Sequence, residues 1–276
     1  MSALPSLRKS DGKTLLVDEL SVAFGGVVAL DGVSMSASQG EVVGVIGPNG
    51  AGKTTLFNVI SGFVRASSGV ISYDGASMEH HHPHDLTKLG IARTLQGVGL
   101  CGGLSVLENV MIGAQNHVHA DIGSALLGLW RSSREERRVA TRAGELLDEL
   151  GIGVYAHHFP ATLPYSIQKR TALARALMAE PSLLLLDEPA SGLSNDEMDD
   201  LGTMIRSLST RMGVLLVEHH MDLVMSVCDR LVVLNFGQVI ADGPPASVRS
   251  NPEVATAYLG DEVPNPPASP GTSDHA

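Results

Sequence analysis

The chain has 276 residues, of which 43% are hydrophobic and 18% are charged, so it can form one large domain or two modest ones. Its formal net charge of −11 argues against nucleic acid as the main partner, because a phosphate backbone is bound by a basic surface. Cys101 and Cys228 stand far apart with no CxxC pattern, which argues against a disulfide framework or a zinc site and favours a reducing cytosol.

The N-terminal region contains no targeting signal that we recognise. Met1 to Lys13 lack an apolar stretch of signal-peptide length, and we expect residues 1–13 to be flexible. No run in the chain approaches the roughly 18–20 apolar residues that span a bilayer. We therefore expect any membrane role to depend on a partner. Thr14 to Phe24 and Val27 to Ser36 are strand-like and meet near Gly25-Gly26, which predicts an antiparallel β region.

Four short apolar runs predict strands buried on both faces of a parallel sheet. These runs are Val42 to Ile46, Leu183 to Leu186, Val214 to Val217 and Leu231 to Leu234. Helical stripes separate them, such as the one formed by Val139, Ala143, Leu146, Leu147 and Leu150. The alternation predicts an α/β fold whose ligand site lies at the carboxyl ends of the strands.

The domain limits follow from the same patterns. We predict one main domain over residues 14–260, with a helical subdomain inserted at about residues 97–165, where helical periodicity dominates. Residues 261–276 contain four prolines together with serine, glycine and asparagine, and few bulky apolar residues. This composition predicts a disordered tail.

The segment that begins at Gly47 fits the pattern G-x-x-x-x-G-K-[ST] and lies between an apolar strand and a helical pattern, as the motif requires. Its glycines let the backbone wrap around a phosphate chain, and the helix N-terminus adds partial positive charge. We expect ATP or GTP here, with Lys53 at the β- and γ-phosphates and the Thr54 hydroxyl on Mg²⁺. The predicted binding residues are Gly47, Pro48, Asn49, Gly50, Ala51, Gly52, Lys53, Thr54 and Thr55.

A second motif is the buried run from Leu183 that ends in Asp187 and Glu188. A carboxylate at a strand end beside the phosphates can hold Mg²⁺ directly or through water, which we predict for Asp187. Glu188 is then placed to orient or deprotonate the attacking water as a general base. The alternative is an acidic pair without a catalytic role, which would make both motifs coincidental.

Further segments, arriving in order, make the chain resemble the ABC ATPases over nearly its whole length. Arg93-Thr94-Leu95-Gln96 resembles the family's Q-loop, and Pro189 to Leu193 its D-loop. Val217-Glu218-His219 resembles the strand end that carries the switch histidine. Phe24 falls where the family has an aromatic ring, and Leu163 to Arg170 hold the position of the L-S-G-G-Q signature.

The resemblance implies a P-loop NTPase of the ABC ATPase type, with ATP and Mg²⁺ as cofactors, an N-terminal antiparallel β subdomain and an inserted helical subdomain. It implies that Phe24 stacks on adenine, that Gln96 links the γ-phosphate and metal to a permease, and that His219 holds the γ-phosphate. The implied catalytic residues are Glu188, His219 and Gln96. The implied metal residues are Thr54, Gln96 and Asp187. The implied signature residues, which act on a partner's nucleotide, are Pro164, Tyr165, Ser166, Ile167 and Gln168.

Other features are similar to the ATP-binding subunits of branched-chain amino acid importers. They include the Q-loop sequence, the tyrosine of the signature, the glutamate before His219, the segment Ala114 to Gly153 and the segment Pro252 to Gly260. This similarity implies an ATPase at the cytoplasmic side of the cell membrane, bound to permease subunits and served indirectly by a solute-binding protein. The solute would be a branched-chain or other hydrophobic amino acid.

The signature departs from the family pattern at two positions. Pro164 replaces a serine whose hydroxyl reaches the partner's γ-phosphate, and Ser166 replaces the second glycine, so its side chain is expected to crowd that phosphate. Losing one hydrogen bond to a charged group costs about 1.5–3 kcal/mol. We therefore expect a heterodimer, in preference to a homodimer, with a second ATP-binding subunit whose signature is intact. His220 and Ser194 also stand where many relatives have aspartate.

Alternative roles remain for two segments and for the whole chain. His80 to His84 hold four histidines, which predicts a solvated loop or, as the alternative, a metal-binding loop. Arg131 to Arg138 predict a solvated helix face or a partner contact. For the chain, the alternatives are a soluble ABC protein without a transport role and a regulatory module that binds ATP without turnover.

Overall fold

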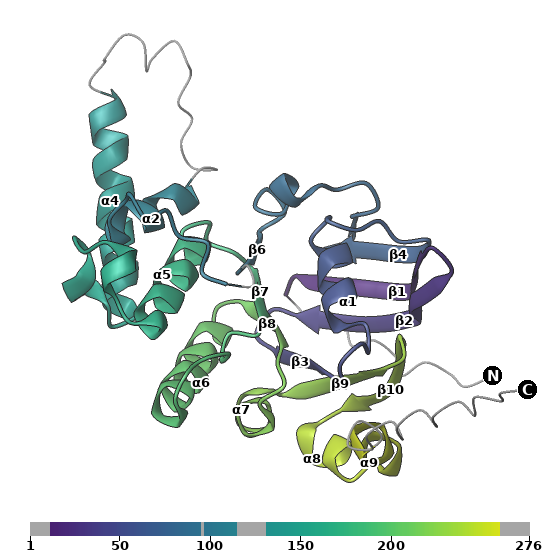
Figure 1. The fold of residues 1–276 in the computed structure, drawn as a ribbon. Helices are drawn as coiled ribbons and strands as arrows, with labels where there is room; N and C mark the ends of the chain where they lie inside the picture. Colours follow the sequence, from purple (N-terminus) through teal and green to yellow (C-terminus); the bar gives the residue numbers. More distant parts are fainter. Residues whose placement is uncertain (1–11, 95–96, 115–130, 260–276) are drawn as a thin grey trace, which may run out of the picture.

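The computed structural model describes residues 12–94, 97–114 and 131–259, and the predicted flexible N-terminus and disordered tail lie almost wholly outside these residues. Two β-sheets form the centre, and helices cover the outer face of the larger sheet (Figure 1). The helices are α1 Lys53–Ile60, α2 Val106–Met111, α4 Arg131–Glu149, α5 Tyr165–Leu177, α6 Asn195–Ser209, α7 Met221–Val227, α8 Pro245–Arg249 and α9 Pro252–Leu259. Short 3₁₀ turns cover Pro83–Asp85, Ile112–Ala114, Gly153–Tyr155 and Pro160–Thr162.

The smaller sheet is antiparallel and has the order β2-β1-β4-β5. Its strands are β1 Thr14–Phe24, β2 Val27–Ser38, β4 Ser68–Tyr73 and β5 Ala76–Ser77. The predicted N-terminal antiparallel region is confirmed, since β1 and β2 pair around a turn at Gly25 and Gly26, both with positive φ. The sequence did not single out β4, whose first three residues are exposed and lack the alternation of a half-buried strand.

The larger sheet has the order β10-β9-β3-β8-β7-β6, and every neighbouring pair except β10 with β9 is parallel. Its strands are β3 Val42–Ile46, β6 Ile91–Arg93, β7 Leu183–Asp187, β8 Gly213–Val217, β9 Arg230–Asn235 and β10 Gln238–Gly243. All four strands predicted from apolar runs are confirmed. Every residue of β3, β7 and β8 is buried, as expected for strands of a sheet that is covered on both faces.

Alternate residues of the parallel strands face two separate hydrophobic cores. Val43 on β3 and Leu185 on β7 pack with Phe57 of α1 and with the inner face of the smaller sheet. Val42 and Leu184 face the opposite side, where the helices pack. The P-loop helix α1 therefore lies between the two sheets, and its position is set by both.

The inserted helical region contains α2, α4 and the start of α5, and lies on the far side of the larger sheet from the smaller one (Figure 1). The predicted stripe is confirmed, because Ala143, Leu146 and Leu147 on α4 and Leu150 just after it are buried, while Val139 is partly buried against the same core. Part of this region, residues 115–130, lies outside the described residues. Over the residues that are described, no helix is both long and apolar enough to cross a bilayer.

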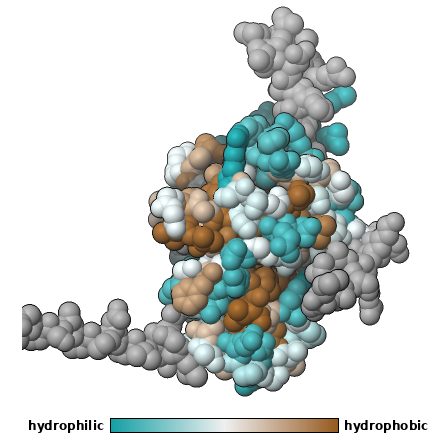
Figure 2. Space-filling view, turned by 90° about the vertical axis from the view of Figure 1, so that its right-hand side faces the viewer, coloured by the Kyte–Doolittle hydropathy of each residue, from teal (hydrophilic) through white to brown (hydrophobic). Residues whose placement is uncertain are grey.

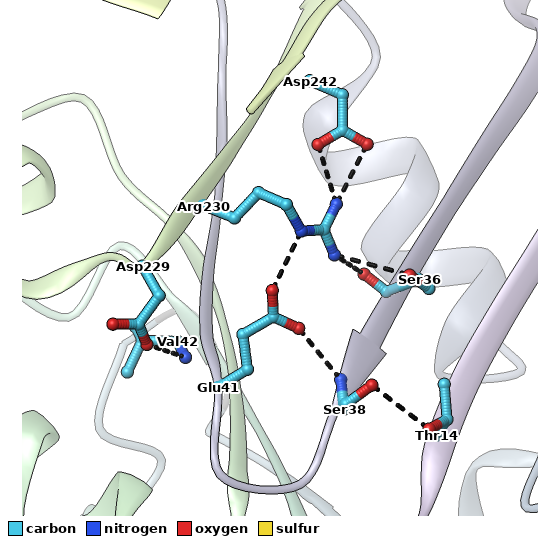
Figure 3. Close-up of polar contacts among 8 residues, drawn as sticks. All are labelled: Thr14, Ser36, Ser38, Glu41, Val42, Asp229, Arg230 and Asp242. Carbon is cyan, nitrogen blue, oxygen red and sulfur yellow. Dashed lines mark hydrogen bonds and ion pairs between the residues drawn. The ribbon is translucent and has the colours of Figure 1, made fainter. Parts of the chain in front are cut away.

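Arg230 at the start of β9 joins the two sheets (Figure 3). Its guanidinium donates to Glu41 Oε1 at 2.9 Å, to both carboxylate oxygens of Asp242 at 2.8 and 2.9 Å, and to the Ser36 carbonyl. Burial alone would lower the pKa of Arg230, but the hydrogen bonds with Glu41 and Asp242 raise it above its usual value. Nearby, the Asp229 carboxylate accepts from the Val42 N–H at 2.8 Å and so fixes the start of β3.

We predict that Arg230→Met lowers the free energy of unfolding by about 2–4 kcal/mol, because two carboxylates lose a cation that hydrogen-bonds to both. Arg206→Met is the matched control, since Arg206 and Asp229 are 43% and 44% exposed and such pairs contribute at most about 1 kcal/mol. Urea unfolding followed by circular dichroism measures both. Equal losses in the two variants would contradict the assigned role of Arg230.

Candidate nucleotide-binding and hydrolysis site

Three loops converge at the carboxyl edge of the larger sheet because their strands run parallel in register. Val45 of β3 pairs with Val217 of β8, and Val217 pairs with Asp187 at the end of β7. The phosphate-binding loop after β3, the acidic pair of β7 and the histidines after β8 therefore leave the sheet side by side. This edge is where α/β folds bind ligands.

The phosphate-binding loop has a backbone conformation that favours glycine at three positions. Gly47, Gly50 and Gly52 have φ angles of 150°, 78° and 105°. A side chain on Gly47 would collide with the Leu234 carbonyl, and one on Gly52 would approach the Ala29 carbonyl to 2.6 Å. The loop is thus wedged between the larger sheet and β2, and its shape is fixed before any ligand binds.

Helix α1 begins at Lys53, and no side chain caps its N-terminus, where the partial positive charge of the helix is concentrated. The Lys53 ammonium donates to the carbonyls of Gly47 at 2.7 Å and Pro48 at 2.8 Å, which holds it across the loop. Thr54 is exposed in the first turn. The loop therefore offers amide donors, a cation and a hydroxyl on one side, the chemistry that binds a phosphate chain.

Asp187 ends β7 and is only 6% exposed, whereas Glu188 is half-buried and directly follows it. One oxygen of Asp187 accepts from Arg93 Nη2 at 2.7 Å. Glu188 has a φ of 47°, which a residue other than glycine rarely adopts, and its N–H donates to the Val217 carbonyl at 2.9 Å. Backbone strain of this kind gathers at functional sites, and here it turns the chain sharply just after the two carboxylates.

His219 follows β8, and its side chain is 56% exposed at the same edge. Glu218, immediately before it, is fully buried: its Oε1 accepts from the Ala190 N–H at 2.7 Å and its Oε2 from the N–H of His219 at 2.9 Å. Oε2 also contacts His220 through its N–H at 3.2 Å and its Nδ1 at 2.9 Å. Glu218 therefore joins the loop of His219 to the loop that follows Glu188, a role the sequence analysis did not assign.

The Glu218, His219 and His220 side chains form the one group with metal-ligand geometry among the described residues. The donors around Glu218 already use both its oxygens, so we interpret this group as a hydrogen-bonded support. Lys169 of α5 supports the same loop. Its ammonium donates to the Pro189 carbonyl at 2.7 Å and to the Glu188 carbonyl at 3.3 Å. Burial lowers the pKa of Lys169, against the opposing effect of the nearby Glu218 and Glu188 carboxylates.

Phe24 ends β1 and is 50% exposed, so its ring is accessible, as adenine stacking would require. On the side of the molecule in Figure 2, hydrophobic areas are scattered among hydrophilic residues. Exposed apolar side chains at nearby turns are Val27 and Val28 on β2 and Phe236 after β9.

Gln96, predicted to contact the metal and γ-phosphate, lies outside the described residues.

The signature segment forms the start of α5, with Pro164 as its N-cap residue and no side-chain cap. The Ser166 hydroxyl hydrogen-bonds the Glu197 carboxylate, and this bond, with the Ser194 N–H bond, lowers the pKa of Glu197. The Ser166 side chain therefore lies near Glu197 of α6, and the expectation that it crowds a partner's phosphate stays a prediction. Gln168 Nε2 donates to the Leu163 carbonyl at 2.9 Å, while Tyr165 is exposed.

Ser194 and the histidine-rich loop have structural contacts. Ser194 caps α6 through a reciprocal pair of hydrogen bonds with Glu197. In the loop, His81 contacts the Met78 carbonyl and, at 2.9 Å, the carbonyl of Ile60 at the end of α1. The solvated-loop interpretation fits His80, His82 and His84 better than a metal site, because the described residues of this loop form no cluster with metal-ligand geometry.

Comparisons with known proteins agree with this geometry. Residues 30–191 match the ABC transporter family, and residues 238–264 match the branched-chain amino acid ATP-binding cassette transporter family. The high-affinity branched-chain amino acid transport ATP-binding protein BraF of Pseudomonas aeruginosa is 39% identical, over 90% of this chain and 98% of the relative. Its counterpart LivG of Escherichia coli is 35% identical over the same shares.

Among solved structures, the ADP conformation of an ATP-binding cassette of an ABC transporter has a TM-score of 0.79 and 32% identity, over 90% of this chain and 99% of that one. A nucleotide-free ATP-binding cassette has a TM-score of 0.78 and 31% identity, over 89% and 98%. The chain belongs to the family of ABC transporter ATP-binding cassettes. Within that family it is similar to the subunits named for branched-chain amino acid transport, so the resemblance inferred from the motifs is confirmed.

We predict that Glu188→Gln keeps ATP binding while lowering hydrolysis at least about a hundred-fold, the range typical of a lost general base. The matched control is Glu79→Gln, a change of the same kind in an exposed loop, which should leave turnover unchanged. Nucleotide binding and phosphate release from the assembled transporter measure the two effects. Near-normal turnover of Glu188→Gln would show that another group serves as the base.

Proposed function

We propose that this chain binds MgATP at the carboxyl edge of its larger sheet and hydrolyses it to drive a membrane permease that imports branched-chain or other hydrophobic amino acids. The observation that carries the proposal is the convergence of Lys53, the acidic pair Asp187 and Glu188, and His219 from three parallel strands. The solute is inferred from the names of the relatives and from the match at residues 238–264.

In this proposal the phosphates lie along the start of α1, where the positive end of the helix dipole and the Lys53 ammonium offset their negative charge. The hydroxyl of Thr54 and the carboxylate of Asp187 are hard oxygen ligands, which suit Mg²⁺. When bound, Mg²⁺ neutralises charge on the β- and γ-phosphates. Glu188 then accepts a proton from the attacking water, and His219 hydrogen-bonds the γ-phosphate.

Coupling to the permease is proposed at a groove beside the strand that leads to Gln96. The groove runs between β6, α5 and the turn after α2, and its lining includes Phe63, Leu86, Ile112 and Ala176. In the ABC transporters that the chain resembles, a permease helix rests in a groove beside the Q-loop. The chain would then work at the cytoplasmic side of the membrane through that contact, and Gln96 would sense both the nucleotide and the permease.

The proposed assembly is a heterodimer with a second ATP-binding subunit. Pro164 has no hydroxyl, and Ser166 directs its own towards Glu197, so this chain presents mainly backbone groups to a partner's nucleotide. Its own phosphate-binding loop and acidic pair are complete. The two composite sites would therefore be unequal, with most hydrolysis at Lys53 and Glu188 of this chain.

We predict that changing Pro164 to Ser together with Ser166 to Gly raises the ATPase rate of the purified chain about ten- to a hundred-fold, the value of one hydrogen bond to a charged group. The same double change should alter the rate of the complete transporter much less, because most of its hydrolysis uses the partner's signature. The proposal of two unequal sites is wrong if the chain alone matches the transporter's ATPase rate per site and the double change alters neither the rate of the chain nor that of the transporter.

Transport itself is tested by uptake of labelled leucine into proteoliposomes that contain the permease subunits with this chain and the second ATP-binding subunit, in the presence of the solute-binding protein. ATP-dependent uptake that disappears with Glu188→Gln supports the proposal, and competition by isoleucine and valine identifies the solute class. If the chain hydrolyses ATP at the same rate with and without the permease, and supports no uptake, a soluble ABC protein is the better interpretation. Binding of ATP with no turnover in either state would favour the regulatory module.

A further inference from the structure

Arg93 forms a buried ion pair with Asp187, the carboxylate proposed to serve the metal. Arg93 is the last residue of β6, and its Nη2 lies 2.7 Å from Asp187 Oδ2. The two side chains are only 8% and 3% exposed. Charge interactions in such a place are screened little by solvent, so the guanidinium has a strong effect on the charge and orientation of this carboxylate.

The other terminal nitrogen of the Arg93 guanidinium, Nη1, is held by the end of α1. It donates to Ser61 Oγ at 2.9 Å, to Asn58 Oδ1 at 3.0 Å and, at 3.4 Å, to the Phe57 carbonyl. The rings of Phe57 and Phe63 both have their centres 5.7 Å from the guanidinium carbon. Contacting Asp187 on one side and the end of α1 on the other requires a planar group with two separate donor nitrogens. Lysine has a single nitrogen and cannot make both contacts.

These contacts have a consequence for the hydrolysis site. The ion pair engages Oδ2 of Asp187, so the carboxylate cannot rotate freely and Oδ1 is the oxygen that we assign to a metal. The positive charge of Arg93 also competes with any cation for the same carboxylate. Such a pair lowers metal affinity while it fixes the geometry of the ligand.

We propose that Arg93 is a positioning residue of the hydrolysis site, which orients Asp187 and moderates its affinity for the metal. The inference rests on the proposed role of Asp187 as a metal residue. Arg93 precedes Gln96 by three residues in the sequence, so one side chain links the strand that leads to Gln96 with α1 and with β7. A displacement of β6 would therefore reach the metal carboxylate directly.

The test measures Mn²⁺ binding by electron paramagnetic resonance, in the presence of a non-hydrolysable ATP analogue, alongside turnover at saturating Mg²⁺. Arg93→Met should tighten Mn²⁺ binding several-fold, because a competing cation is removed, and should lower kcat at least about tenfold, because Asp187 is no longer oriented. Arg93→Lys keeps the charge without the fork, so its Mn²⁺ affinity should stay within about twofold of the parent while kcat falls. Arg206→Met, which removes an exposed arginine, should change neither quantity.

A double-mutant cycle separates this inference from the proposed function. In the Asp187→Asn background, Arg93→Met should change Mn²⁺ affinity less than about twofold, since no charged carboxylate remains to be shared. If Asp187→Asn alone leaves Mn²⁺ binding and turnover unchanged, the metal role of Asp187 fails. If Asp187→Asn weakens binding but Arg93→Met weakens it too, leaves it unchanged, or acts equally in both backgrounds, only the role of Arg93 is overturned. Should Arg93→Met not fold, Arg93→Lys decides the matter, because its parent-like metal affinity and lowered kcat are not what a merely structural arginine would give.

Discussion

The parallel pairing of β3, β8 and β7 is the constraint on which the site depends. It places Ile46, Val217 and Asp187 at one edge of the sheet, so the loops that follow these residues lie side by side once the strands have paired. A slip of one residue in β7 would turn Asp187 to the opposite face and separate it from the phosphate-binding loop. Such a slip is also costly because it would move Ser182 or Glu188, the polar residues that flank the run of leucines, into a fully buried position.

Around this edge, buried charged side chains hold the loops in place. Glu218 fixes the start of the loop after Glu188 through the Ala190 N–H, and Lys169 binds the two consecutive carbonyls of Glu188 and Pro189 at the start of the same turn. Arg93 does the same for Asp187. Each of these groups is costly to bury alone but has hydrogen-bonded partners here, so the geometry of the turn is specified by several contacts at once.

Much of the fold could be predicted from the sequence, because its signals are local. The runs at β3, β7, β8 and β9 gave the sheet, and the glycine-rich segment gave the loop. The contacts of Arg93 with Asp187 and of Glu218 with Ala190 could not be predicted, since they join segments 94 and 28 residues apart and depend on strand order. The glutamate directly after the apolar run of β8 was visible in the sequence, but only the structure shows that its carboxylate is buried and joins two loops.

The most direct test of the account is a structure of Glu188→Gln with ATP and Mg²⁺ in the assembled transporter. The account predicts that Lys53 contacts the β- and γ-phosphates, that Thr54 and Asp187 Oδ1 reach the metal directly or through water, and that His219 lies at the γ-phosphate. Arg93 should remain on Asp187 Oδ2. Nucleotide bound along α1 with the metal remote from Asp187, or with His219 turned away from the phosphates, would contradict the claim that three parallel strands build one hydrolysis site.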